Sequence, residues 1–199
     1  MSAGSKISTT KPPKVRTIMD ELLYESAKSS VNQANLANQK RNVLPPSAIP
    51  TTAQLSLLRE EIEHSAVAIV STVTCLDTYL NSVFEDNVFE DKITSNDLLD
   101  SLKSMGPVQK WYNAPSLLGS STGFNFDSSP MSDFRTIVKY RHKLIIHRQD
   151  IYIKQNSIHI VPEYEHINAA NASLALKTSQ SMISSLCRFI GTSVPGWVI

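Results

Sequence analysis

Apolar residues recur at alternating steps of three and four along a stretch in the middle of the chain, AQLSLLREEIEHSAVAIVSTVTCLDTYLNSVFED. They are Leu55, Leu58, Ile62, Ala66, Ile69, Val73, Leu76, Leu80 and Val83. This spacing predicts one amphipathic helix of about thirty residues. A coiled coil has the same kind of seam, but Val67, Val70 and Phe84 widen the apolar face. The pattern therefore favours the core helix of a bundle.

A second helix is predicted before this one, and prolines separate the two. The segment RTIMDELLYESAKSSVNQANLANQKRN has a narrow apolar edge formed by Ile18, Leu22 and Leu23. The next segment, VLPPSAIPTT, contains three prolines, which interrupt a helix. The sequence leaves open whether the first helix packs on the rest of the chain or extends away from it.

Shorter helices are predicted after the long one. TSNDLLDSLKSM is a helix that Thr94 or Ser95 caps and that Gly106 and Pro107 end. VQKWYNAPSLLG adds one or two turns, and FRTIVKYRHKLIIHRQD, residues 134–150, forms a further helix. EHINAANASLALKTSQSMISSLCRFI is the last helix, and Gly191 ends it.

Between the last two helices the pattern changes to alternation. Ile151 and Ile153 are followed by Ile158 and Ile160, with polar residues between the pairs, which predicts a short β-hairpin. The expected fold is therefore mostly α, a bundle of four to six helices with one hairpin. We expect a disordered polar arm at 1–15, a helix and Pro-rich linker at 16–54, and a helical domain at 55–199.

The amino-acid composition limits the classes of protein to which the chain can belong. The chain has 199 residues with a net charge of +1, enough for one compact domain, and nucleic acid could be bound only through a local basic patch. Cys75 and Cys187 lie in helical stretches without a CxxC motif, so we expect buried free thiols and no metal site. No membrane span or apolar leader is evident, which suggests the cytoplasm.

One arginine stands where an apolar residue is expected. Phe134, Ile137, position 141 and Leu144 form the inward stripe of their helix, and position 141 is Arg. A buried guanidinium costs several kcal/mol unless it is paired. Asp77 lies on the apolar edge of the long helix, so we predict that Asp77 and Arg141 form an ion pair.

A histidine follows the arginine by six residues. On an ideal helix the side chains of Arg141 and His147 differ in direction by about 120°, so they flank Leu144 and can line the two edges of one groove, although the spacing does not imply a direct contact. A histidine can transfer a proton, and an arginine can stabilise a charged phosphate, which together suffice to cleave RNA without metal. The structural alternatives are an ion pair for Arg141 and a helix-dipole contact for His147.

The stretch YRHKLIIHR resembles the signature of the HEPN superfamily, an Arg and a His separated by four to six residues. TCLDTYLNSVF resembles the first core helix of that family, with an acidic residue at the position of Asp77. The order of the following segments also resembles that of bacterial members of defence and toxin systems. It is PVQKWYNAPSLLG, then the helix that contains YRHKLIIHR, then a hairpin and a last helix. The resemblance covers roughly residues 55–190.

The resemblance implies an all-α homodimer that cleaves RNA without a metal or other cofactor, in a toxin–antitoxin or antiviral defence setting with an antitoxin or other partner protein. Arg141 and His147 would be catalytic, Asp77 would orient Arg141, and His142 would replace the more frequent Asn after the arginine. Other members of the family bind nucleotides or partner proteins without catalysis, which is the alternative function. A helical transcription regulator that uses the basic N-terminal arm is a third.

Overall fold

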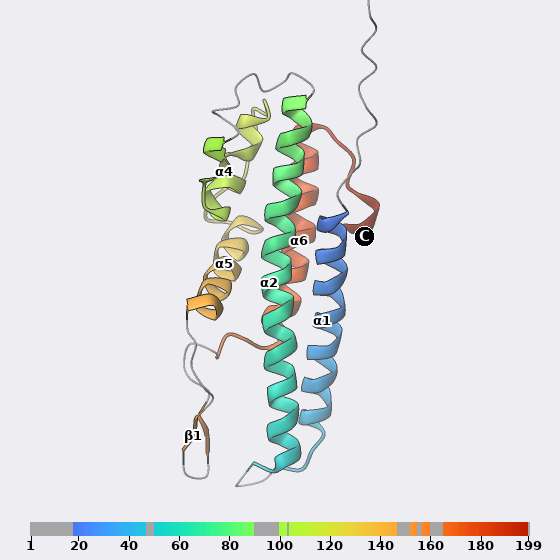
Figure 1. Cartoon of the computed structure of the whole chain (residues 1–199), viewed down its shortest axis with the longest axis vertical. Coiled ribbons are helices and arrows are strands. Elements are labelled where there is room, and N and C mark those ends of the chain that lie inside the picture. Colours follow the sequence, from blue (N-terminus) through green and yellow to red (C-terminus); the bar gives the residue numbers. More distant parts are fainter. Residues whose placement is uncertain are drawn as a thin grey trace, which may run out of the picture.

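The structure, a computed structural model, describes residues 18–46, 50–89, 100–102, 104–146, 152–154, 157–159 and 165–198. The described chain is mostly helical, as predicted (Figure 1). Its elements are α1 (Met19–Asn42), α2 (Thr52–Phe89), α4 (Pro107–Leu117), α5 (Met131–Ile146), β1 (Tyr152–Lys154), β2 (Ser157–His159), α6 (Ala169–Ile190) and the 3-10 helix η2 (Gly196–Val198). The expected arm at 1–15 and the capping residues Thr94 and Ser95 lie outside the described residues.

The segment for which alternation predicted a hairpin contains β1 and β2. The two strands pair antiparallel, with Ile153 opposite Ile158. Each strand has only three residues, so the described core is built from helices.

The long helix predicted from the apolar seam is α2, and it forms the centre of the bundle. Ile69, Val73, Leu76 and Leu80 on the seam are completely buried. Val67 was expected to widen the apolar face, but it is 43% exposed. By length and composition α2 could cross a membrane over Thr52–Asn87, yet 56% of its most apolar window is buried inside the protein, as in the core helix of a bundle.

A second stripe of α2 is also buried, and the apolar pattern does not reveal it. It consists of Glu61, Ser65, Ala68, Thr72 and Cys75, which also follow one another at steps of four and three. This stripe faces α1, because the Cys75 thiol donates to the carbonyl oxygen of Asp20 over 3.2 Å. The thiols of Cys75 and Cys187 are free and buried, as predicted.

Helix α1 packs along α2 and α6 (Figure 1), which settles the question that the sequence left open. Its apolar edge was predicted wrongly, because Ile18 is 59% and Leu22 is 54% exposed. The contact is made instead by a stripe of mostly small residues, namely Tyr24, Ala27, Val31, Ala34 and Ala37. Small side chains let the two helix backbones approach closely, so α1 belongs to the bundle.

The ends of α6 are fixed by local chemistry. The Asn168 side chain accepts a hydrogen bond from the backbone N–H of Asn171 (2.9 Å), which caps the first turn. Gly191 ends the helix with a φ of 71°, a left-handed conformation that favours glycine, as the sequence predicted. Beyond it the chain returns to α1, where the Tyr24 hydroxyl donates to the carbonyl oxygen of Val198 over 3.2 Å.

Helices α4 and α5 lie on the side of α2 away from α1 (Figure 1). Gly106 precedes α4 and Pro107 is its first residue, a position that tolerates the missing N–H of proline. Helix α4 has 11 residues and is longer than the one or two turns predicted. Its Trp111 is completely buried and contacts the rings of Tyr79 and Phe134, which joins α4 to α2 and α5.

Candidate functional site

The candidate site is built on α5, whose inward stripe was predicted correctly at its start. Phe134 and Ile137 are completely buried. Asp133 lies in the first turn and Lys143 in the last, so both charges complement the helix dipole. The Asp133 carboxylate also accepts a hydrogen bond from the Ser129 hydroxyl over 2.7 Å, which fixes the entry into α5.

Arg141 is the next position of the stripe, and its side chain is only half-buried. Its Nε is shielded from solvent and has no hydrogen-bond partner. No ion pair joins Arg141 to a carboxylate among the described residues of the chain. The Arg141 side chain is therefore held partly within the protein surface, and no described carboxylate neutralises its charge.

The predicted pair between Asp77 and Arg141 is not formed, and the prediction was wrong. The Asp77 carboxylate instead accepts a hydrogen bond from the Nζ of Lys110 over 2.7 Å. The same ammonium also donates to the Asn81 side-chain oxygen over 3.1 Å. The Lys110 side chain is 2% exposed, so Lys110 is the deeply buried cation of this region.

The positions of α4 and α5 along α2 explain why Asp77 pairs with Lys110 and not with Arg141. Trp111 contacts both Tyr79 and Phe134, so the start of α5 lies at the level of Asp77. Arg141 follows Phe134 by seven residues, which is about 10 Å further along the helix axis. Lys110 precedes Trp111 and is already at the level of Asp77. Periodicity predicts which side of a helix is buried, but it does not predict this axial level.

The other predicted residues are placed only in part. His142 lies on α5 directly after Arg141, and its side chain is exposed. His147 lies outside the described residues. The catalytic roles of Arg141 and His147 and the supporting role of His142 therefore remain predictions. Asp77 forms its ion pair with Lys110 instead of Arg141.

The structure brings a further histidine to α5 that sequence reasoning missed. The imidazole of His166 stacks on the ring of Tyr140, with centroids 5.1 Å apart and planes inclined by 17°. Tyr140 directly precedes Arg141, and His166 is exposed. The two stacked residues are far apart in sequence and follow no shared pattern, so no signal in the chain predicts their contact.

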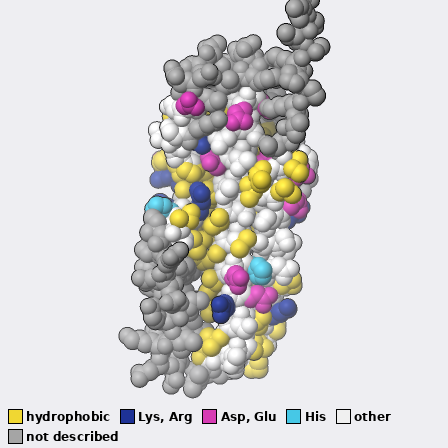
Figure 2. All heavy atoms as spheres, in the orientation of Figure 1, with side chains coloured by type: hydrophobic (Ala, Val, Ile, Leu, Met, Phe, Trp, Pro, Cys, Tyr) yellow, Lys and Arg dark blue, Asp and Glu magenta, His cyan; other side chains and the backbone are white. Residues whose placement is uncertain are grey.

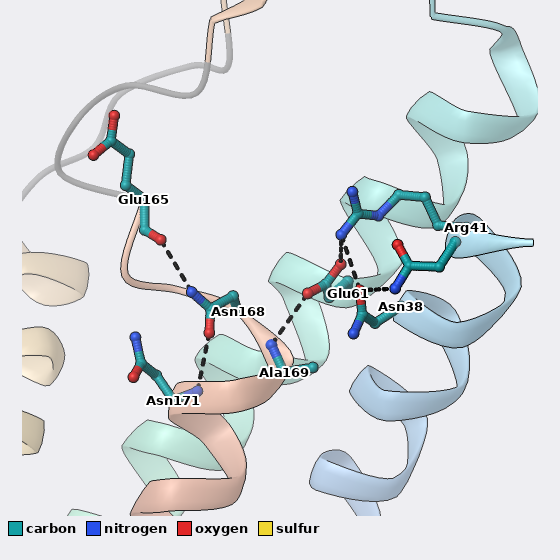
Figure 3. A network of polar contacts seen from close by, with 8 residues as sticks. Asn38, Arg41, Glu61, Glu165, Asn168, Ala169 and Asn171 are labelled. Atoms are coloured by element: carbon teal, nitrogen blue, oxygen red, sulfur yellow. Dashed lines mark hydrogen bonds and ion pairs between the residues drawn. The ribbon is translucent and has the colours of Figure 1, made fainter. Parts of the chain in front are cut away.

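The turn that carries His166 is held by a polar network around Glu61 (Figure 3). Arg41 donates to Glu61 over 2.6 Å, and the backbone N–H of Ala169 donates to the same carboxylate over 3.2 Å. Asn171 then donates to the carbonyl oxygen of His166 over 2.9 Å. A carboxylate at the start of α6 also complements the helix dipole, so this network fixes α1, α2 and α6 together.

The charge of α5 differs from that of the whole chain. The helix contains Arg135, Lys139, Arg141 and Lys143 against the single acidic residue Asp133, a net charge of +3, whereas the chain carries +1. On the face shown in Figure 2, basic, hydrophobic and His side chains lie close together where α5 is situated in Figure 1. Helix α5 is therefore more basic than the chain as a whole, and one of its arginines, Arg135, is paired with Asp127 over 3.4 Å.

Cys75 and the metal-ligating side chains of the described residues add no further candidate site. Burial raises the pKa of the Cys75 thiol to about 12, so it stays protonated near neutral pH and is not a nucleophile. Among the described residues, no group of three or more His, Cys, Asp or Glu side chains could hold a metal ion.

Comparison of the chain with protein-family models, curated proteins and solved structures gives no match. The site on α5 is therefore interpreted from its own residues and from the resemblance of its motif.

Proposed function

We propose that the protein is a metal-independent endoribonuclease whose site is built on α5 around Arg141 and His147. The observation that carries the proposal is the half-buried guanidinium of Arg141, which has no acidic partner among the described residues. A partly buried arginine whose charge no described carboxylate neutralises is suited to bind a phosphate. The net charge of +3 on α5 supports the same class of ligand.

The reaction proposed for this site is an internal transfer. The 2′-hydroxyl of a ribose attacks the adjacent phosphorus, and the bond from phosphorus to the 5′-oxygen of the next nucleotide breaks. The products are a 2′,3′-cyclic phosphate and a 5′-hydroxyl. Arg141 stabilises the charge that grows on the phosphoryl oxygens, and His147 transfers a proton to or from the ribose oxygens. The RHKLIIHR motif supports these two roles through its resemblance to the HEPN signature.

We further propose that the active form is a homodimer. The six-residue spacing would separate the directions of Arg141 and His147 by about 120° on an ideal helix, so the spacing alone does not imply that one chain brings both groups to one phosphate. A two-fold axis beside α5 would bring the same patch of two chains together and combine their Arg and His side chains. A toxin–antitoxin or defence setting, with an antitoxin or other partner protein, follows from the resemblance alone.

A module that binds a nucleotide or partner protein without catalysis is the alternative, because an Arg141 without a carboxylate partner among the described residues is also suited to the phosphate of a nucleotide. The two functions differ in whether RNA is cut.

The proposal is tested with purified protein and total bacterial RNA in EDTA. Wild type should cut the RNA and leave 2′,3′-cyclic phosphate ends, whereas His147→Ala should cut at least about 100-fold more slowly, the usual contribution of a general acid or base. His64→Ala is the matched control, because His64 lies on α2 outside the site. Equal cutting by wild type and His147→Ala would contradict the proposal, and absence of cutting by all three proteins would favour the binding module.

A further inference from the structure

A hollow of about 460 Å³ lies between the start of α4 and the middle of α5. Its walls include Pro107 and Val108 at the start of α4, Tyr112 one turn later, Phe126 from the following loop, and Val138 on α5. The volume is within the range of about 300–1,000 Å³ that is usual for small-molecule sites. The walls are almost entirely apolar, so the hollow suits a flat, uncharged group.

Two aromatic rings form an exposed wall of this hollow. Tyr112 is 44% and Phe126 is 37% exposed, and their rings meet edge to face with centroids 5.3 Å apart. The guanidinium of Arg135 lies over the Phe126 ring at 3.9 Å from its centroid. It also donates to the carbonyl oxygen of Phe126 over 3.2 Å. These contacts hold Phe126 in place before any ligand binds.

No charged side chain among the described residues lines the hollow itself, but two arginines of α5 lie near it, and one of them, Arg135, is paired with Asp127 at 3.4 Å. On an ideal helix Arg135, Arg141 and His142 lie within about 60° of Val138, with Arg135 and Arg141 on opposite sides of it and about 120° apart. At the other end of the hollow, the start of α4 has Gly106 before it and no side-chain cap, so the positive end of the helix dipole is open. An apolar hollow between two positive regions is complementary to a base whose neighbouring phosphates are negative.

We propose that this hollow is a base-binding subsite for single-stranded RNA, and that the subsite serves the proposed nuclease site. A nucleobase lies against Tyr112 and Phe126, and its phosphate lies toward Arg141, which is one helical turn from Val138. The apolar walls stack on any base, so this subsite binds single strands with little preference for sequence. Paired bases are excluded, because their faces are already stacked within a duplex.

The test separates binding from cleavage by the choice of probe. Full-length protein is titrated into a short fluorescein-labelled 2′-O-methyl oligoadenylate, which lacks the free 2′-hydroxyl and is not cut. Affinity is measured by fluorescence anisotropy in EDTA. A second probe has the same backbone with abasic positions in place of bases, so that it has the phosphates without the stacking surfaces.

Wild type should bind the oligoadenylate on the order of ten-fold more tightly than the abasic probe, in line with the usual contribution of a stacked base. Tyr112→Ala should lose about the same factor toward the oligoadenylate and almost nothing toward the abasic probe. Tyr112→Phe keeps the ring and should bind as wild type does. Leu36→Ala removes an exposed apolar side chain of α1 and is the control. Thermal unfolding of each variant confirms that it is folded.

Several outcomes would overturn the subsite. These are equal affinity of wild type for the two probes, unchanged binding by Tyr112→Ala, or binding of an apolar dye in the hollow without binding of the oligonucleotide. If wild type cuts RNA but Tyr112→Ala binds normally, the subsite is wrong and the nuclease stands. If the oligonucleotide binds through Tyr112 but no RNA is cut, the nuclease is wrong and the subsite stands.

Discussion

The ammonium group of Lys110 determines which residue the Asp77 carboxylate pairs with. Its side chain is 2% exposed, and a buried charge is tolerated only when it is paired and hydrogen-bonded. The Asp77 carboxylate and the Asn81 side-chain oxygen supply those contacts. Asp77 therefore neutralises Lys110, and Arg141 has no carboxylate partner among the described residues.

This assignment predicts an order of stabilities among variants. Asp77→Ala leaves the Lys110 ammonium buried without a carboxylate and should lower the free energy of unfolding by about 3–5 kcal/mol. Arg141→Ala removes a half-buried side chain that pairs with no carboxylate among the described residues, so its cost should be about 1 kcal/mol or less. Urea unfolding followed by circular dichroism measures both. A larger loss of unfolding free energy for Arg141→Ala than for Asp77→Ala would contradict this assignment and support an ion pair between Asp77 and Arg141.

At the level of the elements, α2 is buried on two sides, but only one of them is apolar. The seam through Ile69 and Leu76 is visible in the sequence because large apolar residues repeat at helical spacing. The stripe through Glu61 and Cys75 is formed by polar and small residues, so hydrophobic periodicity does not detect it. For the same reason the face of α1 that packs on α2 was predicted wrongly.

The network around Glu61 is the main polar contact between these elements. Arg41→Ala should leave the Glu61 carboxylate, 4% exposed, with only the N–H of Ala169 as a partner. The free energy of unfolding should then fall by about 3 kcal/mol. Lys40→Ala is the matched control, because Lys40 is exposed on the same helix and should change stability by less than about 0.5 kcal/mol. Thermal or urea unfolding gives both values, and equal effects of the two variants would show that the network contributes little.

At the scale of the whole molecule, the bundle of α1, α2 and α6 supports one basic helix, α5, at its side. The mostly α class, the central helix and the buried stripe at the start of α5 could be predicted, because each depends on local spacing. The stack of Tyr140 on His166 and the pairing of Lys110 could not be predicted, because each depends on how far one helix is displaced along another.

The homodimer can be tested by mixing two inactive proteins. If one active site takes Arg141 from one chain and His147 from the other, a mixture of Arg141→Ala and His147→Ala should cut RNA well above the sum of the separate rates. Light scattering of the wild type should give the mass of two chains. A mixture that stays inactive after its subunits have exchanged would argue against a shared site.

The most direct test of the central claim is the rate at which Arg141→Ala cuts RNA in EDTA, measured on protein shown to be folded. Because Arg141 has no acidic partner among the described residues, we predict a loss of about 100-fold or more in rate. The unfolding midpoint should stay within a few degrees of the wild-type value. An unchanged rate, or a loss of rate only in proportion to a loss of folded protein, would show that Arg141 serves the fold and that α5 is not a nuclease site.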